Sequence, residues 1–90
     1  MDVTTKQYVD NIVKSRTVIL ETTDWSNNAL TAIVSGVTTT NVIIVNPAPG
    51  SQSDYTDAGI LCTAQAADSL TFTCETVPLT DITVNVLILG

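Results

Sequence analysis

The sequence predicts a mainly β protein, in which a short N-terminal α-helix is followed by a small antiparallel β-sandwich. Two observations indicate this class. After Arg16 the composition changes to Val, Ile and Thr, and six short stretches with strand character follow. Clusters of Gly, Pro, Asn and Asp separate these stretches, as in small all-β domains. We therefore predict a helical segment for trimerisation or attachment over 1–16 and a β-sandwich domain over 17–90.

The first stretch, VTTKQYVDNIV, carries the signals that begin a helix. Thr4 is the expected N-cap with Gln7 as its capping-box partner, and Val3 and Tyr8 stand at the two positions of a hydrophobic staple. Two basic residues follow and suit the negative end of the helix dipole, so the predicted helix ends near Ser15.

This helix has an apolar face that is wide for its length. Tyr8 and Ile12 lie one turn apart, with Val9 on the adjoining stripe. An isolated helix shorter than about 12–15 residues is unstable in water. The helix is therefore expected to dock on something, and we predict that Tyr8, Val9 and Ile12 contact other copies of the chain.

The first half of the β region contains three expected strands. The stretch TVILE (17–21) is the first, and ALTAIVSGV is the second, with Leu30, Ala32 and Val34 on one apolar face. A third strand over 41–46 is stopped by prolines, which cannot donate ladder hydrogen bonds. The stretch 51–59 is either one helical turn ended by glycine or a loop.

The second half reads as a hairpin and a final strand. Strands over 60–66 and 70–76 are expected to pair about a turn centred on Asp68. One face of this hairpin would be apolar and would hold Ile60, Cys62, Ala64, Ala66, Leu70, Phe72 and Cys74. In the final strand, Ile82, Val84, Val86 and Ile88 share one face, and Leu87 and Leu89 make the end of the other face apolar too.

The two cysteines leave two possibilities open. Cys62 and Cys74 are equidistant from Asp68, so a symmetric hairpin would place them opposite each other at a distance that permits a disulfide. The alternative, which we favour, is a pair of reduced cysteines that pack as small apolar side chains.

Size and charge restrict the partners. A 90-residue chain buries a modest share of its surface, so oligomerisation is a plausible source of stability. Residues 86–89 are apolar on both faces of the final strand, which is more than one small core needs. This indicates contacts between copies, and we predict Val86 and Ile88 as interface residues. With net charge −6 and all three basic residues before position 17, nucleic-acid binding is disfavoured. The longest apolar run, VNVLILG, is too short to span a membrane.

No constellation of catalytic residues is recognisable, so we predict a protein that is not an enzyme and has no cofactor or metal. The chain has no His, the commonest general base. Asp54 and Asp57 flank Tyr55 and can be read as ligands for a hard cation, or as ordinary capping residues of a polar loop, which we favour. Trp25 and Tyr55 are candidate ligand contacts, although Trp25 is more readily explained as a lid over the core.

Two stretches resemble bacteriophage proteins. TTKQYVDNIV is similar to the Thr-Lys-x-Tyr-Val-Asp segments of phage tail-fibre and head-fibre proteins, and the rest of the chain looks like a small β module of phage virion proteins. The resemblance implies a homotrimer located in the virion, with Tyr8, Val9 and Ile12 in a three-fold helix contact. It also implies other virion proteins of the capsid or tail as partners.

Two alternatives remain beside a trimeric fibre or spike. One is a capsid decoration protein that grips the shell through its N-terminal region. The other is a receptor- or glycan-binding module, in which Trp25, Tyr55 and the neighbouring Asn and Asp side chains contact a host-surface glycan.

Overall fold

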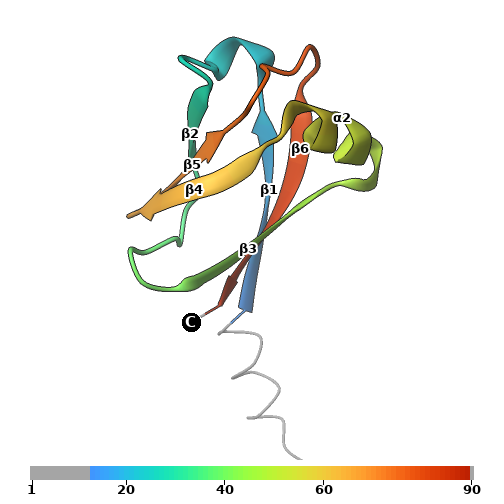
Figure 1. Ribbon diagram of the computed structural model, residues 1–90. Coiled ribbons are helices and arrows are strands. Elements are labelled where there is room, and N and C mark those ends of the chain that lie inside the picture. The colour runs from blue at the N-terminus through green and yellow to red at the C-terminus, as the bar shows by residue number, and fades with distance from the viewer. Residues whose placement is uncertain (1–12, 90) are drawn as a thin grey trace, which may run out of the picture.

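The computed structural model describes residues 13–89, which form two three-stranded antiparallel sheets around one core (Figure 1). In the first sheet, with order β1–β6–β3, the strands are β1 (Val13–Leu20), β6 (Ile82–Leu89) and β3 (Val42–Pro47). In the second sheet, with order β2–β5–β4, they are β2 (Ala29–Ile33), β5 (Ser69–Thr73) and β4 (Leu61–Ala66). The predicted mainly β class is confirmed.

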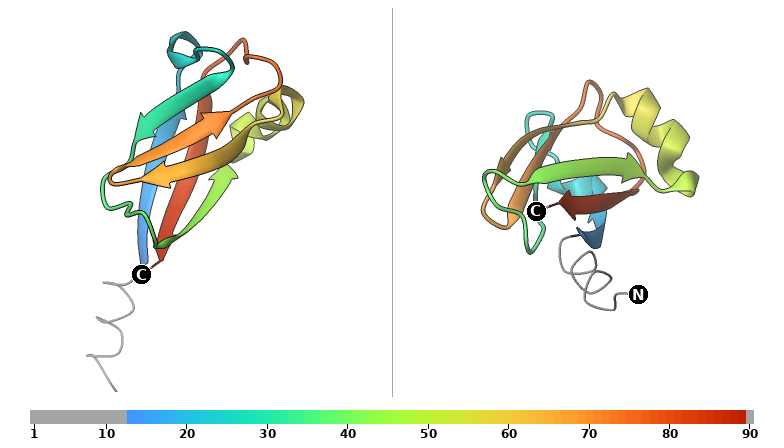
Figure 2. Two further views of the ribbon diagram at one scale, coloured as in Figure 1. Left: turned by 60° about the vertical axis from the view of Figure 1, so that its left-hand side comes forward. Right: turned by 90° about the horizontal axis from the view of Figure 1, so that it is seen from below.

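The core lies between the two sheets because alternate residues of each strand point inward. β6 supplies Ile82, Val84, Val86 and Ile88, none of them more than 2% exposed, as the alternation in the sequence predicts. β5 supplies Leu70 and Phe72, which have no exposed surface. Figure 2 shows the two layers from the side and from below.

Two of the connections between strands contain helical elements. η1 (Thr22–Asp24) connects β1 to the Trp25 loop, and η2 (Pro49–Ser51) leads from β3 into α2 (Gln52–Ala58). Of the two possibilities for 51–59, the helix is the one observed. The expected end at Gly59 is confirmed, with φ of 66° in the left-handed region. Ser51 is the N-cap residue, and its Oγ accepts a hydrogen bond from the Thr83 amide at 3.0 Å.

The predicted N-terminal helix lies mostly outside the described residues, but its C-terminal boundary is wrong. Residues 13–16, which were expected to finish the helix, form the first half of β1 and pair with 86–89 of β6. The basic residues Lys14 and Arg16 therefore belong to a strand. The Arg16 Nε donates to the Ser35 backbone oxygen at 3.1 Å.

The β4–β5 hairpin exists, but its predicted register is wrong. Ala66 pairs with Ser69, so the turn has two residues and is not centred on Asp68, whose φ is 57°. A further irregularity between Cys62 and Ala64 leaves Thr63 without a partner and sets Cys62 opposite Phe72. As a result, Ala64 and Ala66 lie opposite Thr71 and Ser69 on the outer face of the sheet. Cys62 remains on the same face as Phe72, but it is exposed because β4 is an edge strand.

Within residues 13–89, no helix has the length and apolar character needed to cross a membrane.

Candidate functional site

A cleft of about 490 Å³ lies between β3 and β4. These strands are the outermost members of the two sheets, and they face each other across the open side of the molecule. Ile43 and Val45 of β3 line one wall, residues 61–65 of β4 line the other, and Tyr55 reaches it from α2. We call this hollow the β3–β4 cleft.

Gln65 ties the two sheets together beside the β3–β4 cleft. Its Nε2 donates to the backbone oxygens of Thr38 at 2.8 Å and Asn41 at 2.9 Å, in the loop that leads into β3. These bonds hold the end of β4 against the start of β3. One end of the cleft is therefore closed by a fixed side chain.

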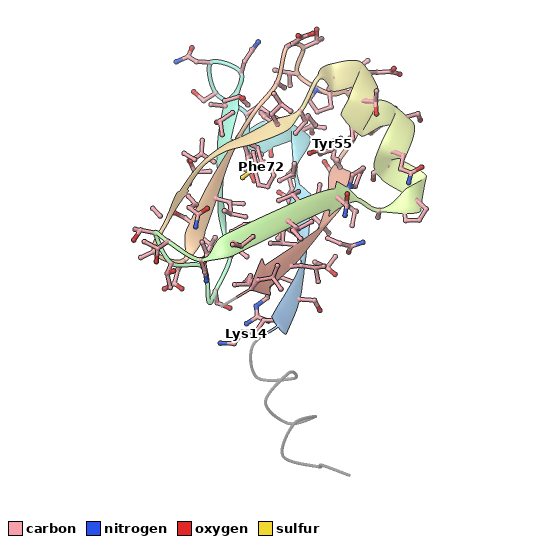
Figure 3. All side chains as sticks on the ribbon, turned by 60° about the horizontal axis from the view of Figure 1, so that its bottom comes forward. Lys14, Tyr55 and Phe72 are labelled. Carbon is pink, nitrogen blue, oxygen red and sulfur yellow. The ribbon has the colours of Figure 1, made fainter. Side chains whose placement is uncertain are left out.

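Tyr55 and Cys62 are the ionisable groups of the cleft, and both are neutral at pH 7. Burial raises the pKa of Tyr55, and the nearby Cys62 raises it further. Burial also raises the pKa of the Cys62 thiol, and hydrogen bonding with the Ala64 backbone partly offsets this rise. Figure 3 labels Tyr55 on α2 and Phe72 between the sheets. The cleft therefore offers an uncharged lining.

With this geometry in view, the chain can be set against known proteins. Comparisons with protein-family models, curated protein sequences and solved structures find no match. The candidate surfaces are therefore interpreted from their own chemistry.

A second candidate surface lies on the outer face of the β1–β6–β3 sheet. Ile44 pairs with Leu87, and Val42 pairs with Leu89, so these four apolar side chains form a continuous group that we call the outer patch. Val42 is 59% exposed, Ile44 42% and Leu87 37%. Further along the same face the paired residues are polar, as with Asn46 and Asn85. The outer patch lies at the end of the sheet at which β1 begins. At the opposite end of the same face, Ile19 of β1 is also apolar and is 55% exposed.

The predicted interface residues fall into two groups. Tyr8, Val9 and Ile12 lie outside the described residues. Val86 and Ile88 point into the core of their own chain, with 0% and 2% exposure, so they are not available to a second copy. The choice of face was therefore wrong for β6, and the side chain that this strand end exposes is Leu87. The sequence does contain a signal for the outer patch, since the run VIIV at 42–45 is apolar on both faces of one strand.

The candidate ligand contacts Trp25 and Tyr55 do not line a common cavity. Tyr55 lines the β3–β4 cleft and a second hollow that Gly59 also borders. Trp25 packs against the core, and its buried Nε1 has no hydrogen-bond partner within residues 13–89. This position agrees with the interpretation of Trp25 as a lid.

Of the two α2 carboxylates, Asp54 stabilises the local structure. Asp54 Oδ2 accepts a hydrogen bond from Thr80 Oγ1 at 3.0 Å, which fixes the loop before β6 to α2. Asp54 and Asp57 border the same hollow of about 250 Å³, together with Pro78 and Leu79. Within residues 13–89, no three His, Cys, Asp or Glu side chains gather in a way that could hold a metal ion.

The disulfide alternative is wrong in this structure, since Cys62 and Cys74 are both free. Cys62 is exposed in the β3–β4 cleft, whereas Cys74 is buried in the core. Because the hairpin register differs from the symmetric one, the two thiols are not paired across the strands.

Proposed function

We propose that the chain is a non-enzymatic structural protein of a bacteriophage particle, a homotrimeric head-fibre, spike or tail-fibre-like appendage attached through its N-terminal region. The resemblance of TTKQYVDNIV to phage fibre segments supports the assignment to a virion. The outer patch is the observation that carries the trimeric part of the proposal.

The outer patch lies where a trimer held by its N-terminal segments would bring the β domains together. Val13, the first described residue, pairs with Leu89, and Leu89 pairs with Val42 of the outer patch. The segment that carries Tyr8, Val9 and Ile12 therefore joins the domain directly beside these exposed apolar side chains. If the outer patches of neighbouring copies touch, their apolar side chains are removed from water. Burial of apolar surface is the main driving force of association.

The distribution of charge supports the same orientation. Lys14 and Arg16 lie near the beginning of β1, where Figure 3 shows Lys14. Most of the described carboxylates lie toward the opposite end, on η1, α2 and the loops that flank them: Glu21, Asp24, Asp54, Asp57, Glu75 and Asp81. An acidic outward end would keep densely displayed copies soluble and apart.

The mass of the protein in solution tests the trimer. Light scattering should give about three times the 9.5 kDa chain mass. Ile44→Asp should lower this mass toward that of one chain, because it places a charge in the apolar contact. Ile12→Asp should act in the same direction through the N-terminal segment.

Ile33→Asp is the matched control, since Ile33 is 80% exposed on β2 of the other sheet and lies outside the outer patch. This variant should keep the wild-type mass. A monomeric wild-type protein would refute the trimer, as would an equal loss of mass in the Ile33 and Ile44 variants.

A capsid decoration protein is the second candidate, because the outer patch can equally face a shell of other subunits. Purified protein mixed with particles that lack it should then bind to the capsid and not to isolated tails. Binding to tails alone would favour the fibre.

A further inference from the structure

The two strands that border the β3–β4 cleft each have one unpaired edge. β3 is hydrogen-bonded only to β6, and β4 only to β5, because both strands are outermost in their sheets. Apart from these ladders, the backbone of residues 42–46 and 61–66 forms no hydrogen bond to other backbone groups of the described chain. Open edges of this kind are templates for a further strand.

β4 is thinly covered by the rest of the domain. Like β3, it contains no buried residue, and Cys62 is exposed although it lies on the same face as the buried Phe72. Its neighbour β5, in contrast, buries Leu70 and Phe72 completely. On the opposite wall, Ile43 and Val45 point toward the core but are only partly buried, because the cleft leaves them open to solvent.

We propose that the β3–β4 cleft binds an extended, uncharged polypeptide segment, which adds a strand to the free edge of β4 or β3. The backbone groups of the edge would supply hydrogen bonds, and Ile43 and Val45 would receive alternate apolar side chains of the segment. This inference does not depend on the oligomeric state or on the virion assignment.

The lining determines the chemistry and length of the segment. The cleft contains no acidic or basic side chain, so a charged residue of the segment would lose water without gaining an ionic partner. The wall of β4 from Leu61 to Gln65 accommodates about five extended residues, or about 16 Å. Gln65 closes one end through its bonds to the 38–41 loop, which sets the register of the bound segment.

Cys62 allows a direct test, because its free thiol lies in the cleft. The probe is a pool of acetylated, amidated pentapeptides of Val, Ile, Thr, Ser and Gln around a central cysteine, each supplied as its disulfide with cysteamine. The Cys62 thiolate attacks the peptide sulfur and releases cysteamine as a thiol, so the exchange is reversible and stronger binders accumulate. Intact-mass measurement identifies the captured peptides.

The captured amount of each unmodified peptide should exceed that of its counterpart methylated at alternate backbone nitrogens by about tenfold. Methylation removes the hydrogen-bond donors that an added strand needs. Ala64→Lys, in the cleft wall, should reduce capture by a similar factor. Ala66→Lys is the control, because Ala66 is exposed on the same strand but does not line the cleft. NMR spectra of a captured adduct should show slower amide exchange along β3 or β4.

Equal capture of the methylated peptides would overturn the proposal, as would equal effects of the Ala64 and Ala66 variants. Capture without any slowing of amide exchange in β3 or β4 would also refute it. If N-acetylglucosamine oligomers shift the same amide signals while peptides do not, the cleft binds glycans and the peptide proposal fails.

Discussion

Cys62 and Cys74 show how strongly the reactivity of a thiol depends on its surroundings. Both are free thiols, but Cys62 is exposed in the cleft and Cys74 is 8% exposed in the core. Burial raises the pKa of the Cys74 thiol, so the reactive thiolate is both disfavoured and inaccessible there. The two residues should therefore differ strongly in reactivity.

We expect iodoacetamide to modify one thiol per native chain, at Cys62, and both thiols in urea. Because the pKa of Cys62 is raised, its thiolate fraction is small at pH 7, and labelling should accelerate as the pH rises to about 9. Peptide mass mapping measures the site and extent of modification. A mass deficit of two protons with no labelling would instead indicate a disulfide.

The sequence could predict which residues are apolar but not always which side of a strand faces the core. For β6, the alternation correctly placed Val84 and its companions on one face. It could not show that the same face would be fully covered by the second sheet, and Val86 and Ile88 were wrongly chosen as interface residues. Burial depends on the partner layer, which alternation within one strand does not specify.

At the scale of elements, the end of α2 was predictable because it depends on a local conformation. Gly59 has φ of 66°, and its amide donates to the Thr56 oxygen at 3.1 Å. A Cβ atom at this position would also approach Glu75 Cγ to 2.9 Å. Glycine satisfies both requirements, since it lacks a Cβ and adopts positive φ without steric cost.

Gly59→Ala should lower the free energy of unfolding by about 1–2 kcal/mol, because alanine is disfavoured in the left-handed region. Urea denaturation provides the measurement. The matched control is Gly50→Ala, since nothing lies within 4 Å of a Cβ added there. This variant should match the wild type or gain up to about 1 kcal/mol. Equal losses in both variants would contradict the explanation.

The β4–β5 hairpin was predictable as an element but not in its register. The apolar residues of its two strands would share one face if the turn were centred on Asp68. The observed turn has two residues, Ala67 and Asp68, and shifts β4 by one position relative to β5. A side-chain period of two means that such a shift exchanges the faces. The irregularity at Thr63 then shifts the pairing again, and a single sequence gives no clear signal for it.

At the scale of the whole molecule, the two sheets depend on a single core. Leu20, Val84 and Phe72 come from both sheets and belong to one buried cluster. Neither sheet has a second apolar layer of its own, so the loss of packing on one side should affect the other.

Leu70→Ala should destabilise the protein by about 2–5 kcal/mol, since it leaves a cavity at a position with no exposed surface. Hydrogen exchange should accelerate in both sheets together. Leu79→Ala, at a position that is 97% exposed, should change the stability by less than about 0.5 kcal/mol. Faster exchange in the β2–β5–β4 sheet alone would show that the sheets unfold separately.

The fold class was thus predictable from strand patterns and turn residues, while the candidate surfaces were predictable only in part. The outer patch has a signal in the doubly apolar runs at 42–45 and 86–89. The β3–β4 cleft has none, because it arises from how two sheets of limited width meet at their edges.

The pairing of Val13 with Leu89 means that the polypeptide enters and leaves the domain side by side. An affinity tag or fluorescent protein fused directly to the domain at Val13 or Leu89 would therefore sit next to the outer patch and obstruct assembly. A label is better inserted at the opposite end of the domain, in the exposed loop around Leu79 and Thr80.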